Sequence, residues 1–535
     1  MAAPRPVHVQ LVIRAPGRRV LWGAAVAVVA VLIVVRNLSS LDSAPVGAYV
    51  DETSIGYNAW AISTHGVDEH GAHLPLYFTA FGEYKNPVYI YTLSALLRIL
   101  PLTVATERLP AALFGMLTCL FVALIAWRRS RSLPITVLAL ALAGLTPWLT
   151  VESRVGFEVI SMLAVVSAAL WCLSIAQNGG RTAWYIAAGC LLGIAVFAYS
   201  TGRVAVVLFT VALVAAECWR RRRVGAWLAT MIPIGAAYLA LGAWNLMHPG
   251  ALTARFSLIS IAADGAPPLT VLGRFAGNYL TYFGPDFLFL TGDHNPRHNT
   301  QFGGMLLWVT LPLVLAGLVA AWRRRTEPFI RFLLLGVLLA PVSAALTEES
   351  VPHAVRAAVT LPFLLVLAVE GIILLRERLG ASRRPAYAIA AAVLAVQGAL
   401  FTIDMYATWP VRSAVAFDAG EVDAITRAEA LTGGTPLLLS QSLDQPYIQA
   451  AFAFRPAPPA TFTPDSATPL LAALDVQLID GANPPSRPGA IAVLSAADPA
   501  PAHAQMLFSE VTPAAALALG APPPPYLTVV VYRLG

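Results

Sequence analysis

The chain has 535 residues, of which 58% are hydrophobic and only 12% are charged, and its mean hydropathy is +0.69. Soluble proteins carry about a quarter charged residues, so this composition excludes a soluble fold and predicts a polytopic integral membrane protein. The net charge of +6 comes from short arginine clusters between apolar segments, which is typical of cytoplasmic loops and argues against nucleic-acid binding.

Apolar segments long enough to cross a bilayer, which takes roughly 20 residues, recur along the chain. We expect about eleven spans and therefore a mainly α fold, a transmembrane helical bundle. The candidate spans are residues 20–40, 105–127, 133–150, 156–176, 183–199, 204–218, 225–246, 304–321, 328–346, 357–375 and 385–404. No convincing cleavage site closes the first segment, so we expect it to remain in the protein.

The arginine clusters test this topology independently of the count. With that number of spans they all fall on one side, which the positive-inside rule assigns to the cytoplasm. The clusters are Arg14/Arg18/Arg19, Arg128/Arg129/Arg131, Arg181, Arg220 to Arg223, Arg323 to Arg325 and Arg376/Arg378/Arg383/Arg384. Most of the unusual polar residues then lie on the opposite face, so we expect an extracytoplasmic active site.

The first outer loop, residues 42–104, has the pattern of two short helices joined by a polar hairpin. Residues 53–64 and 86–100 are too short to span, so both are predicted to lie along the membrane surface. In the second, Asn86 is a candidate cap and Pro87 fits the first helical position.

After the long outer loop at residues 247–303 and the last span, the composition changes. Short strand-like runs and one helical pattern alternate with Ala/Pro-rich linkers from residue 405 onward. The runs are Pro436–Leu439, Ala490–Leu494 and Leu527–Tyr532, and the helical pattern covers residues 419–431. We therefore divide the chain into a transmembrane module, residues 1–404, and a small extracytoplasmic α/β domain, residues 405–535.

Asp51 and Glu52 directly follow the first span. Forming a glycosidic bond requires a base that takes the proton of an acceptor hydroxyl, and a partly desolvated carboxylate suits that task. The alternative is that Asp51 caps a helix beginning near Thr53, and one carboxylate can serve both purposes.

The segment Glu83-Tyr84-Lys85-Asn86 contains the only lysine of the chain. An ammonium group suits a phosphate, while an aromatic face and polar side chains suit a sugar ring. This combination indicates a glycosyltransferase with a lipid-phosphate sugar donor, and the alternative is an ordinary solvated loop.

Several cations on the outer face break the positive-inside rule, which indicates another role. Arginines aimed at a departing lipid phosphate would stabilise the transition state, although pairing with glutamates or headgroups is the alternative. The substrate-binding candidates are Tyr57, Glu83, Tyr84, Lys85, Asn86, Glu152, Arg154, Arg203, His353 and Arg356, with Asp51 and Glu52 as the catalytic candidates.

Two groups of potential metal ligands have loose spacing. They are Asp68, Glu69, His70 and His73, and Asp286, Asp293, His294 and His298. We expect no metal cofactor, with a divalent ion as the alternative. The four cysteines, Cys119, Cys172, Cys190 and Cys218, lie in or beside apolar spans and are expected to be free thiols.

The order of these motifs resembles the C-type (GT-C) glycosyltransferases. Asp51-Glu52, then Lys85-Asn86-Pro87, a short helix and Glu107-Arg108-Leu109-Pro110 are similar to the family 39-like enzymes, relatives of the protein O-mannosyltransferases and the lipid A aminoarabinose transferase. The resemblance is best over residues 20–205. It implies a polyprenyl-phosphate sugar donor, transfer outside the cytoplasm and inversion at the anomeric carbon.

By that resemblance Asp51 is the catalytic base, Glu52 its partner, and Lys85 a contact of the carrier phosphate. The chain has Lys85-Asn86-Pro87 where Lys-Pro-Pro is commoner, and it lacks the repeat modules of eukaryotic protein mannosyltransferases. A glycan or lipid acceptor is therefore favoured over a protein.

Alternatives are a polysaccharide ligase or polymerase with a lipid-pyrophosphate donor and, less favoured, a lipid or sugar transporter. Frequent Ala and Arg suggest a GC-rich bacterial genome, and hence a multi-pass protein of the bacterial plasma membrane.

Overall fold

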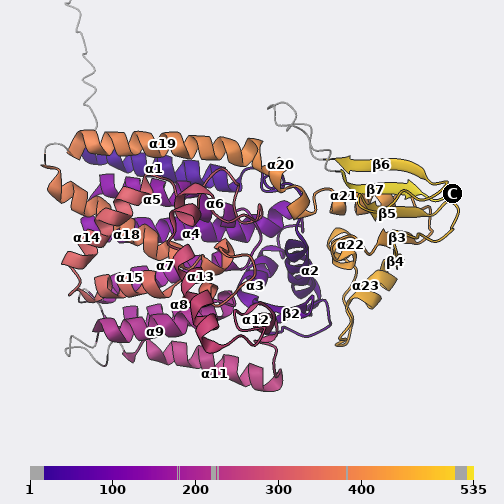
Figure 1. Ribbon diagram of the computed structural model, residues 1–535, viewed down its shortest axis with the longest axis horizontal. Coiled ribbons are helices and arrows are strands. Elements are labelled where there is room, and N and C mark those ends of the chain that lie inside the picture. Colours follow the sequence, from indigo (N-terminus) through magenta and orange to yellow (C-terminus); the bar gives the residue numbers. More distant parts are fainter. Residues whose placement is uncertain are drawn as a thin grey trace, which may run out of the picture.

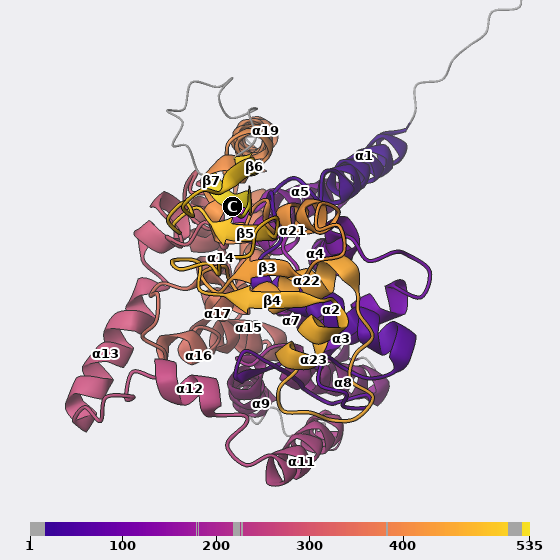
Figure 2. The same cartoon turned by 90° about the vertical axis from the view of Figure 1, so that its right-hand side faces the viewer.

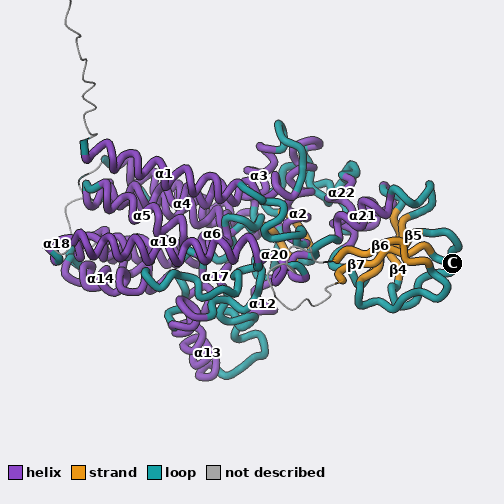
Figure 3. Tube along the Cα trace, turned by 90° about the horizontal axis from the view of Figure 1, so that it is seen from above, coloured by secondary structure: helices purple, strands orange, loops and turns teal. Residues whose placement is uncertain are grey.

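The computed structural model describes residues 17–177, 179, 181–217, 225, 228–380, 383–511 and 527–535. Long helices run side by side in a bundle, and a sheet with flanking helices lies at one end of it (Figure 1). Figure 3 shows the same division, with the five strands of this sheet gathered around the C-terminus.

A helix overlaps each segment predicted to span the membrane. These helices are α1 (Arg18–Leu38), α4 (Val104–Ser130), α5 (Leu133–Leu145), α7 (Val159–Ala176), α8 (Thr182–Ala198), α9 (Gly202–Glu217), α11 (Met231–Met247), α14 (Thr310–Arg323), α15 (Pro328–Leu339), α18 (Thr360–Arg378) and α19 (Arg383–Ala407). In the described part of the chain, five helical segments are long and apolar enough to cross a bilayer, and five more apolar helices are shorter. The number of membrane spans, about eleven, remains a prediction.

Local sequence explains where several of these helices begin. The Thr103 side chain accepts a hydrogen bond from the Thr106 N–H at 3.1 Å and caps α4. Proline occupies the first turn of α5 and of α15, where its missing N–H costs nothing. Cys119, Cys172 and Cys190 are free thiols, while Cys218, Arg14 and Arg220 to Arg223 lie outside the described residues.

Shorter elements connect the long helices and surround the end of the bundle that faces the sheet. They include α2 (Val50–His65), strands β1 (Phe78–Ala80) and β2 (Glu83–Lys85), α3 (Pro87–Leu96), α6 (Pro147–Glu152), α12 (Ala254–Ile259), α13 (Pro268–Thr281), η2 (Asp286–Leu290), α16 (Val342–Ala345), α17 (Ala354–Ala357), α20 (Trp409–Ser413) and η4 (Val415–Phe417). Seen from the sheet end, α11 and α13 lie at the periphery of the molecule (Figure 2).

Helix α2 is not the surface helix that the sequence predicts. It begins at Val50 rather than Thr53, so Asp51 and Glu52 lie in its first turn, and most of its residues are buried. Ile55 and Ile62 pack in the bundle core, as expected of one apolar face. The opposite side is covered as well, by the helices beside the sheet, and this second contact is why the helix is buried.

Residues 421–533 supply the sheet and its helices. The strand order is β4-β3-β5-β7-β6, with β3 parallel to β4 and β5, and β7 antiparallel to β5 and β6. The strands are β3 (Leu437–Ser440), β4 (Val476–Ile479), β5 (Ile491–Ser495), β6 (Gln505–Val511) and β7 (Leu527–Arg533), and the helices are α21 (Glu421–Glu429), α22 (Pro446–Phe454) and α23 (Ala467–Ala473). The sequence indicates β3, β5 and β7 but not the edge strands β4 and β6, which carry exposed positions.

Candidate active site

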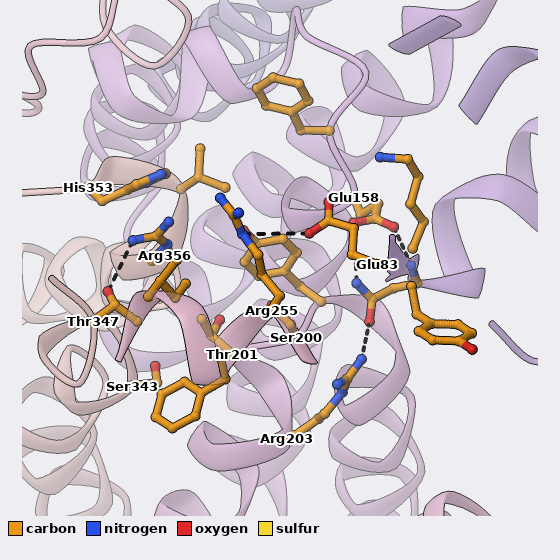
Figure 4. A pocket seen from close by; sticks show the side chains of 18 of the residues that line it. Glu83, Glu158, Ser200, Thr201, Arg203, Arg255, Ser343, Thr347, His353 and Arg356 are labelled. Atoms are coloured by element: carbon orange, nitrogen blue, oxygen red, sulfur yellow. Dashed lines mark hydrogen bonds and ion pairs between the residues drawn. The ribbon is translucent and has the colours of Figure 1, made fainter. Parts of the chain in front are cut away.

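A cavity of about 570 Å³ lies where α2, β2, α9 and α12 meet the loop at residues 343–356. Its wall includes eight of the predicted site residues. They are Asp51, Glu83, Tyr84, Lys85, Asn86, Arg203, His353 and Arg356. Figure 4 shows four of them, Glu83, Arg203, His353 and Arg356, which come from different elements and face one space.

Asp51 and Lys85 form an ion pair in the cavity wall, with 2.6 Å between Asp51 Oδ1 and Lys85 Nζ. Asp51 is in the first turn of α2, and Lys85 ends the hairpin strand β2, where it pairs with Phe78. Lys85 is only 5% exposed. Burial alone would lower its pKa, but Asp51 and then Glu158 raise the pKa above its ordinary value, so this group is an ammonium ion.

Asn86 is held by Glu158, a cavity residue that the sequence did not indicate. The Asn86 backbone N–H donates to Glu158 Oε1, its amide donates to Oε2 at 3.2 Å, and Arg203 Nη2 donates to Asn86 Oδ1 at 3.3 Å. Burial raises the Glu158 pKa to about 7, against the opposing effects of Lys85 and the Asn86 hydrogen bonds. The expected capping of α3 by the Asn86 side chain does not occur, because that side chain is engaged by Glu158 and Arg203.

Arg255 of α12 pairs with two carboxylates from different elements, and Figure 4 shows the pair with Glu83 of β2. Its guanidinium is 3.7 Å from Glu83 and 2.9 Å from Glu349. Arg356 also pairs with Glu349, at 2.6 Å. Arg255, Arg356, Arg203 and Lys85 thus supply several cations to the cavity, and most of them are paired with carboxylates. An incoming anion could replace these carboxylates as the partner of the cations.

The cavity wall also includes an apolar part. It is lined by Val204 of α9, Leu241 of α11, Leu252 before α12, and Phe256 and Ile259 of α12. Tyr84 lies nearby, with its ring in an edge contact with Trp244 at 5.3 Å between centroids. An amphipathic ligand therefore finds polar partners and an apolar surface in the same cavity.

In the described part of the chain, one group of three potential metal ligands has its ligand atoms within 4.8 Å of one another. It consists of Asp293, His298 and His353. His298 Nδ1 is 2.9 Å from Asp293 Oδ2, which also accepts the Ala354 N–H at 2.7 Å. Burial, and then His298 and Arg356, lower the His353 pKa well below its ordinary value. By residue type the group suits a metal, but the neighbouring arginines disfavour a cation there.

Comparisons with known proteins agree on one architecture. Residues 84–260 match the family described as dolichyl-phosphate-mannose-protein mannosyltransferase. The crystal structure of ArnT from Cupriavidus metallidurans bound to undecaprenyl phosphate superposes with a TM-score of 0.52 at 16% identity, covering 96% of this chain and 97% of that one. The apo form gives 0.52 at 17% identity, with 96% and 98% covered.

The chain has the GT-C glycosyltransferase fold. Its apolar helices and this fold make it a multi-pass membrane protein. An oligosaccharyltransferase from Archaeoglobus fulgidus, solved with Zn and sulfate, gives a TM-score of 0.49 at 14% identity over 88% of this chain and 68% of that one. Curated protein sequences give no match.

Within this GT-C fold, Glu52 is not at the cavity. It accepts hydrogen bonds from Arg108 Nε at 2.7 Å and Nη2 at 2.8 Å, and Arg108 is itself fully buried. Glu52 also accepts the Gly156 N–H at 2.9 Å. The catalytic role predicted for Glu52 is therefore corrected to a structural one, because all its contacts point into the protein.

Arg154 is likewise not aimed at a ligand. It is fully buried and donates to the backbone carbonyls of Ala44, Arg36, Ser39 and Ser40 at 2.6 to 2.9 Å. Several of these carbonyls end α1, where helix carbonyls lack partners in their own helix. The prediction that it binds the leaving phosphate is wrong, because its donors are already used.

Glu152 and Tyr57 also lie outside the cavity wall. Glu152 is buried in α6, and burial, then Asp293, raise its pKa to about 8. The Tyr57 hydroxyl donates to the Pro456 carbonyl at 2.9 Å. The structure thus does not bring either side chain to the cavity wall, and both are enclosed by protein.

The first predicted group of metal ligands does not converge. Asp68 accepts backbone N–H groups of His70 and Ala72, and His70 Nδ1 lies 2.9 Å from the Thr463 carbonyl. Within the described residues, neither this group nor Asp286 and His294 brings three ligand atoms together.

Proposed function

We propose that the chain is a glycosyltransferase that moves a sugar from a polyprenyl-phosphate donor to an acceptor hydroxyl on the extracytoplasmic face, with inversion. The observation that carries the proposal is the 2.6 Å contact between Asp51 and Lys85 on the wall of a large cavity. It puts a carboxylate that can accept a proton beside an ammonium group that can bind phosphate.

The cavity offers the two kinds of surface that such a donor needs. Lys85, Arg203, Arg255 and Arg356 would meet the phosphate, and the apolar side formed by α9, α11 and α12 would receive the start of the polyprenyl chain. Glu83 pairs with Arg255, and Tyr84 contacts Trp244 of α11, so these two residues are proposed to hold the sugar. The similarity to ArnT bound to undecaprenyl phosphate supports a lipid carrier of this class.

The reaction balances with these groups alone. The acceptor oxygen forms a bond to the anomeric carbon while the bond from that carbon to the phosphate oxygen breaks. Asp51 takes the acceptor proton, and the lipid phosphate leaves with the electron pair, its growing charge stabilised by Lys85 and the arginines. Attack opposite the leaving group inverts the configuration. We propose this reaction without a metal.

Binding of the donor would also prepare Asp51 for its role. In the structure the Lys85 ammonium lies 2.6 Å from Asp51 Oδ1 and so occupies one oxygen of the proposed base. A phosphate that attracts the Lys85 ammonium would weaken this pair and free the Asp51 carboxylate to meet the acceptor hydroxyl. Phosphate binding and proton acceptance are thereby linked through one ion pair.

The charge distribution supports the proposed orientation. The ends of α4 and α14 carry Arg128, Arg129 and Arg323, and α1 and α19 begin at the bundle end far from the sheet (Figure 1). The cavity and the sheet lie toward the other end. Under the positive-inside rule this distribution supports a cavity outside the cytoplasm, and we propose that the membrane is a bacterial plasma membrane.

The experiment begins with mass spectrometry of the cell envelope from a strain without this protein, because the missing sugar identifies donor and acceptor together. The purified chain is then assayed with the corresponding polyprenyl-phosphate and polyprenyl-pyrophosphate sugars. Asp51→Asn and Lys85→Ala should each lose activity about 100-fold or more, while Asp42→Asn, an exposed carboxylate of the same loop, should not.

Full activity in both variants would reject the assigned roles. Activity with the pyrophosphate donor alone would favour the ligase or polymerase alternative. Counterflow of the lipid-linked sugar in vesicles, without any covalent product, would instead identify a transporter.

A further inference from the structure

Helix α2, which carries Asp51, belongs to two hydrophobic cores at once. Ile55, Ala59 and Ile62 pack in the core of the helical bundle. Val50 and Tyr57 pack in the core of the sheet and its helices, with residues such as Ile448 of α22. The position of the proposed base is therefore set from both sides of the helix.

Asp418, which follows η4, caps this helix from a distance of 368 positions in sequence. The Val50 N–H, the first of α2, donates to Asp418 Oδ2 at 3.1 Å. The first N–H groups of a helix have no partner within it, and a side-chain oxygen there stabilises the first turn. Glu52 Oε2 accepts the Tyr49 N–H at 3.0 Å in a capping box, and Asp418 adds an acceptor for the next N–H, that of Val50, beside Asp51.

The backbones around this contact are in tight proximity. Gly47 has φ +86°, and a Cβ at this position would lie 2.3 Å from the Phe417 carbonyl oxygen and 2.7 Å from Ala419 Cα. Asp418 itself has φ +49°, an unusual conformation for a residue with a side chain. Residues 417–419 are therefore pressed against the entry to α2, and their geometry is fixed by that contact.

Helix α22 supports the same junction. The fully buried amide of Gln449 lies 3.5 Å from both the Ala48 carbonyl and Asp418 Oδ2. About two turns along α2 from Val50, the Tyr57 hydroxyl donates to the Pro456 carbonyl, just beyond α22. The sheet region thus holds α2 at two points on one face.

From these contacts we infer that Asp418 is a positioning residue for Asp51, and that the α/β region serves to fix the catalytic helix. Without the Asp418 cap, the first turn of α2 loosens and the Asp51 carboxylate loses its fixed place beside Lys85. The effect on catalysis rests on the proposed function, but the effect on the helix does not.

The charges around Asp418 make asparagine the conservative replacement at this position. Burial, then Asp444, raise the Asp418 pKa to about 8, while the Val50 N–H and Arg297 lower it and Glu52 raises it. The side chain therefore acts largely as a neutral acceptor at pH 7, and an asparagine carbonyl oxygen can accept the same N–H.

Hydrogen exchange followed by mass spectrometry on the full chain tests the inference directly. Asp418→Ala should speed exchange in the first turn of α2 by about fivefold or more, the loss typical of a helix cap. Asp418→Asn should restore slow exchange, and Asp423→Ala, an exposed acidic residue of α21, should leave it unchanged. Equal exchange in Asp418→Ala and the unchanged protein would overturn the inference.

Two further measurements test the inference, one by hydrogen exchange in Gln449→Ala and one by the kinetics of the Asp418 variants. If Asp418→Ala does not fold, Gln449→Ala should raise exchange at the same turn while the helices of the bundle stay protected, and unchanged exchange there would overturn the inference. Where transferase activity is found, Asp418→Ala should lower kcat with little change in the donor KM, and Asp418→Asn should rescue it. An exchange effect without any transferase activity would reject the proposed function and keep the positioning role.

Discussion

The Arg108 guanidinium donates to both carboxylate oxygens of Glu52, and the same guanidinium donates to the backbone carbonyls of Leu41, Pro45 and Gly47. Glu52 and its neighbour Asp51 are therefore adjacent in sequence but opposite in role. One carboxylate is enclosed in a structural network, and the other is open to the cavity.

This contrast predicts opposite outcomes for two neighbouring substitutions. Glu52→Gln should lower the free energy of unfolding by about 3–5 kcal/mol, because it leaves the buried Arg108 without a counter-charge. Asp51→Asn should leave the thermal unfolding temperature near its original value while abolishing transfer. Differential scanning fluorimetry in detergent measures the first effect, and a stable Glu52→Gln protein would contradict the prediction.

A second pair of substitutions separates a ligand contact from a structural one. Arg255→Ala removes a half-exposed cation from the cavity, so it should raise the donor KM without a loss of stability. Arg154→Ala leaves several buried carbonyls without a donor, each costing about 1–3 kcal/mol, so it should lower expression and the unfolding temperature. Reversal of the two phenotypes would reject the assigned positions.

Glu158 predicts a pH dependence of stability. Its pKa in the folded protein is raised to about 7 from an ordinary value of 4.5, so the folded state favours the protonated form. That contribution is complete below about pH 4.5 and is lost as the pH rises through about 7. In Glu158→Gln the side chain cannot ionise.

The unfolding temperature of the unchanged protein should therefore fall relative to that of Glu158→Gln between pH 5 and pH 8. If the pKa of Glu158 were ordinary, the unfolding temperatures of the two proteins would follow parallel curves across this pH range. Parallel curves would thus show that Glu158 is not perturbed.

Metal removal provides a further prediction. Because arginines act on His353 in this group, and the proposed reaction uses only Asp51, Lys85 and the cavity arginines, dialysis against a chelator should leave the transfer rate unchanged. Restoration of a lost rate by a divalent ion would refute the metal-free proposal and direct attention to those three ligands.

The sequence predicted the helical segments and the chemistry of the cavity better than it predicted individual contacts. Apolar stretches mark helices without tertiary information, and a single lysine among arginines drew attention to Lys85. Arg154 was misjudged because its partners are backbone carbonyls, which carry no sequence signature. Glu52 was misjudged because its partner Arg108 is 56 positions away.

Residues missed by the sequence analysis had weaker signals. Glu158 precedes a long apolar helix, a position where an acidic side chain is commonly structural. Arg255 lies in the long outer loop, which has no periodic pattern to show that its side chain reaches Glu83 and Glu349. The cap of α2 by Asp418 joins segments that are far apart in sequence, so it required the folded arrangement.

The shared packing of α2 limits how this protein can be recombined. A chimera that exchanges the region after residue 404 for that of another protein would place an unfamiliar surface against Val50 and Tyr57. Such an exchange succeeds only if the Gly47–Tyr57 segment is transplanted with it, so the natural unit for engineering is discontinuous in sequence.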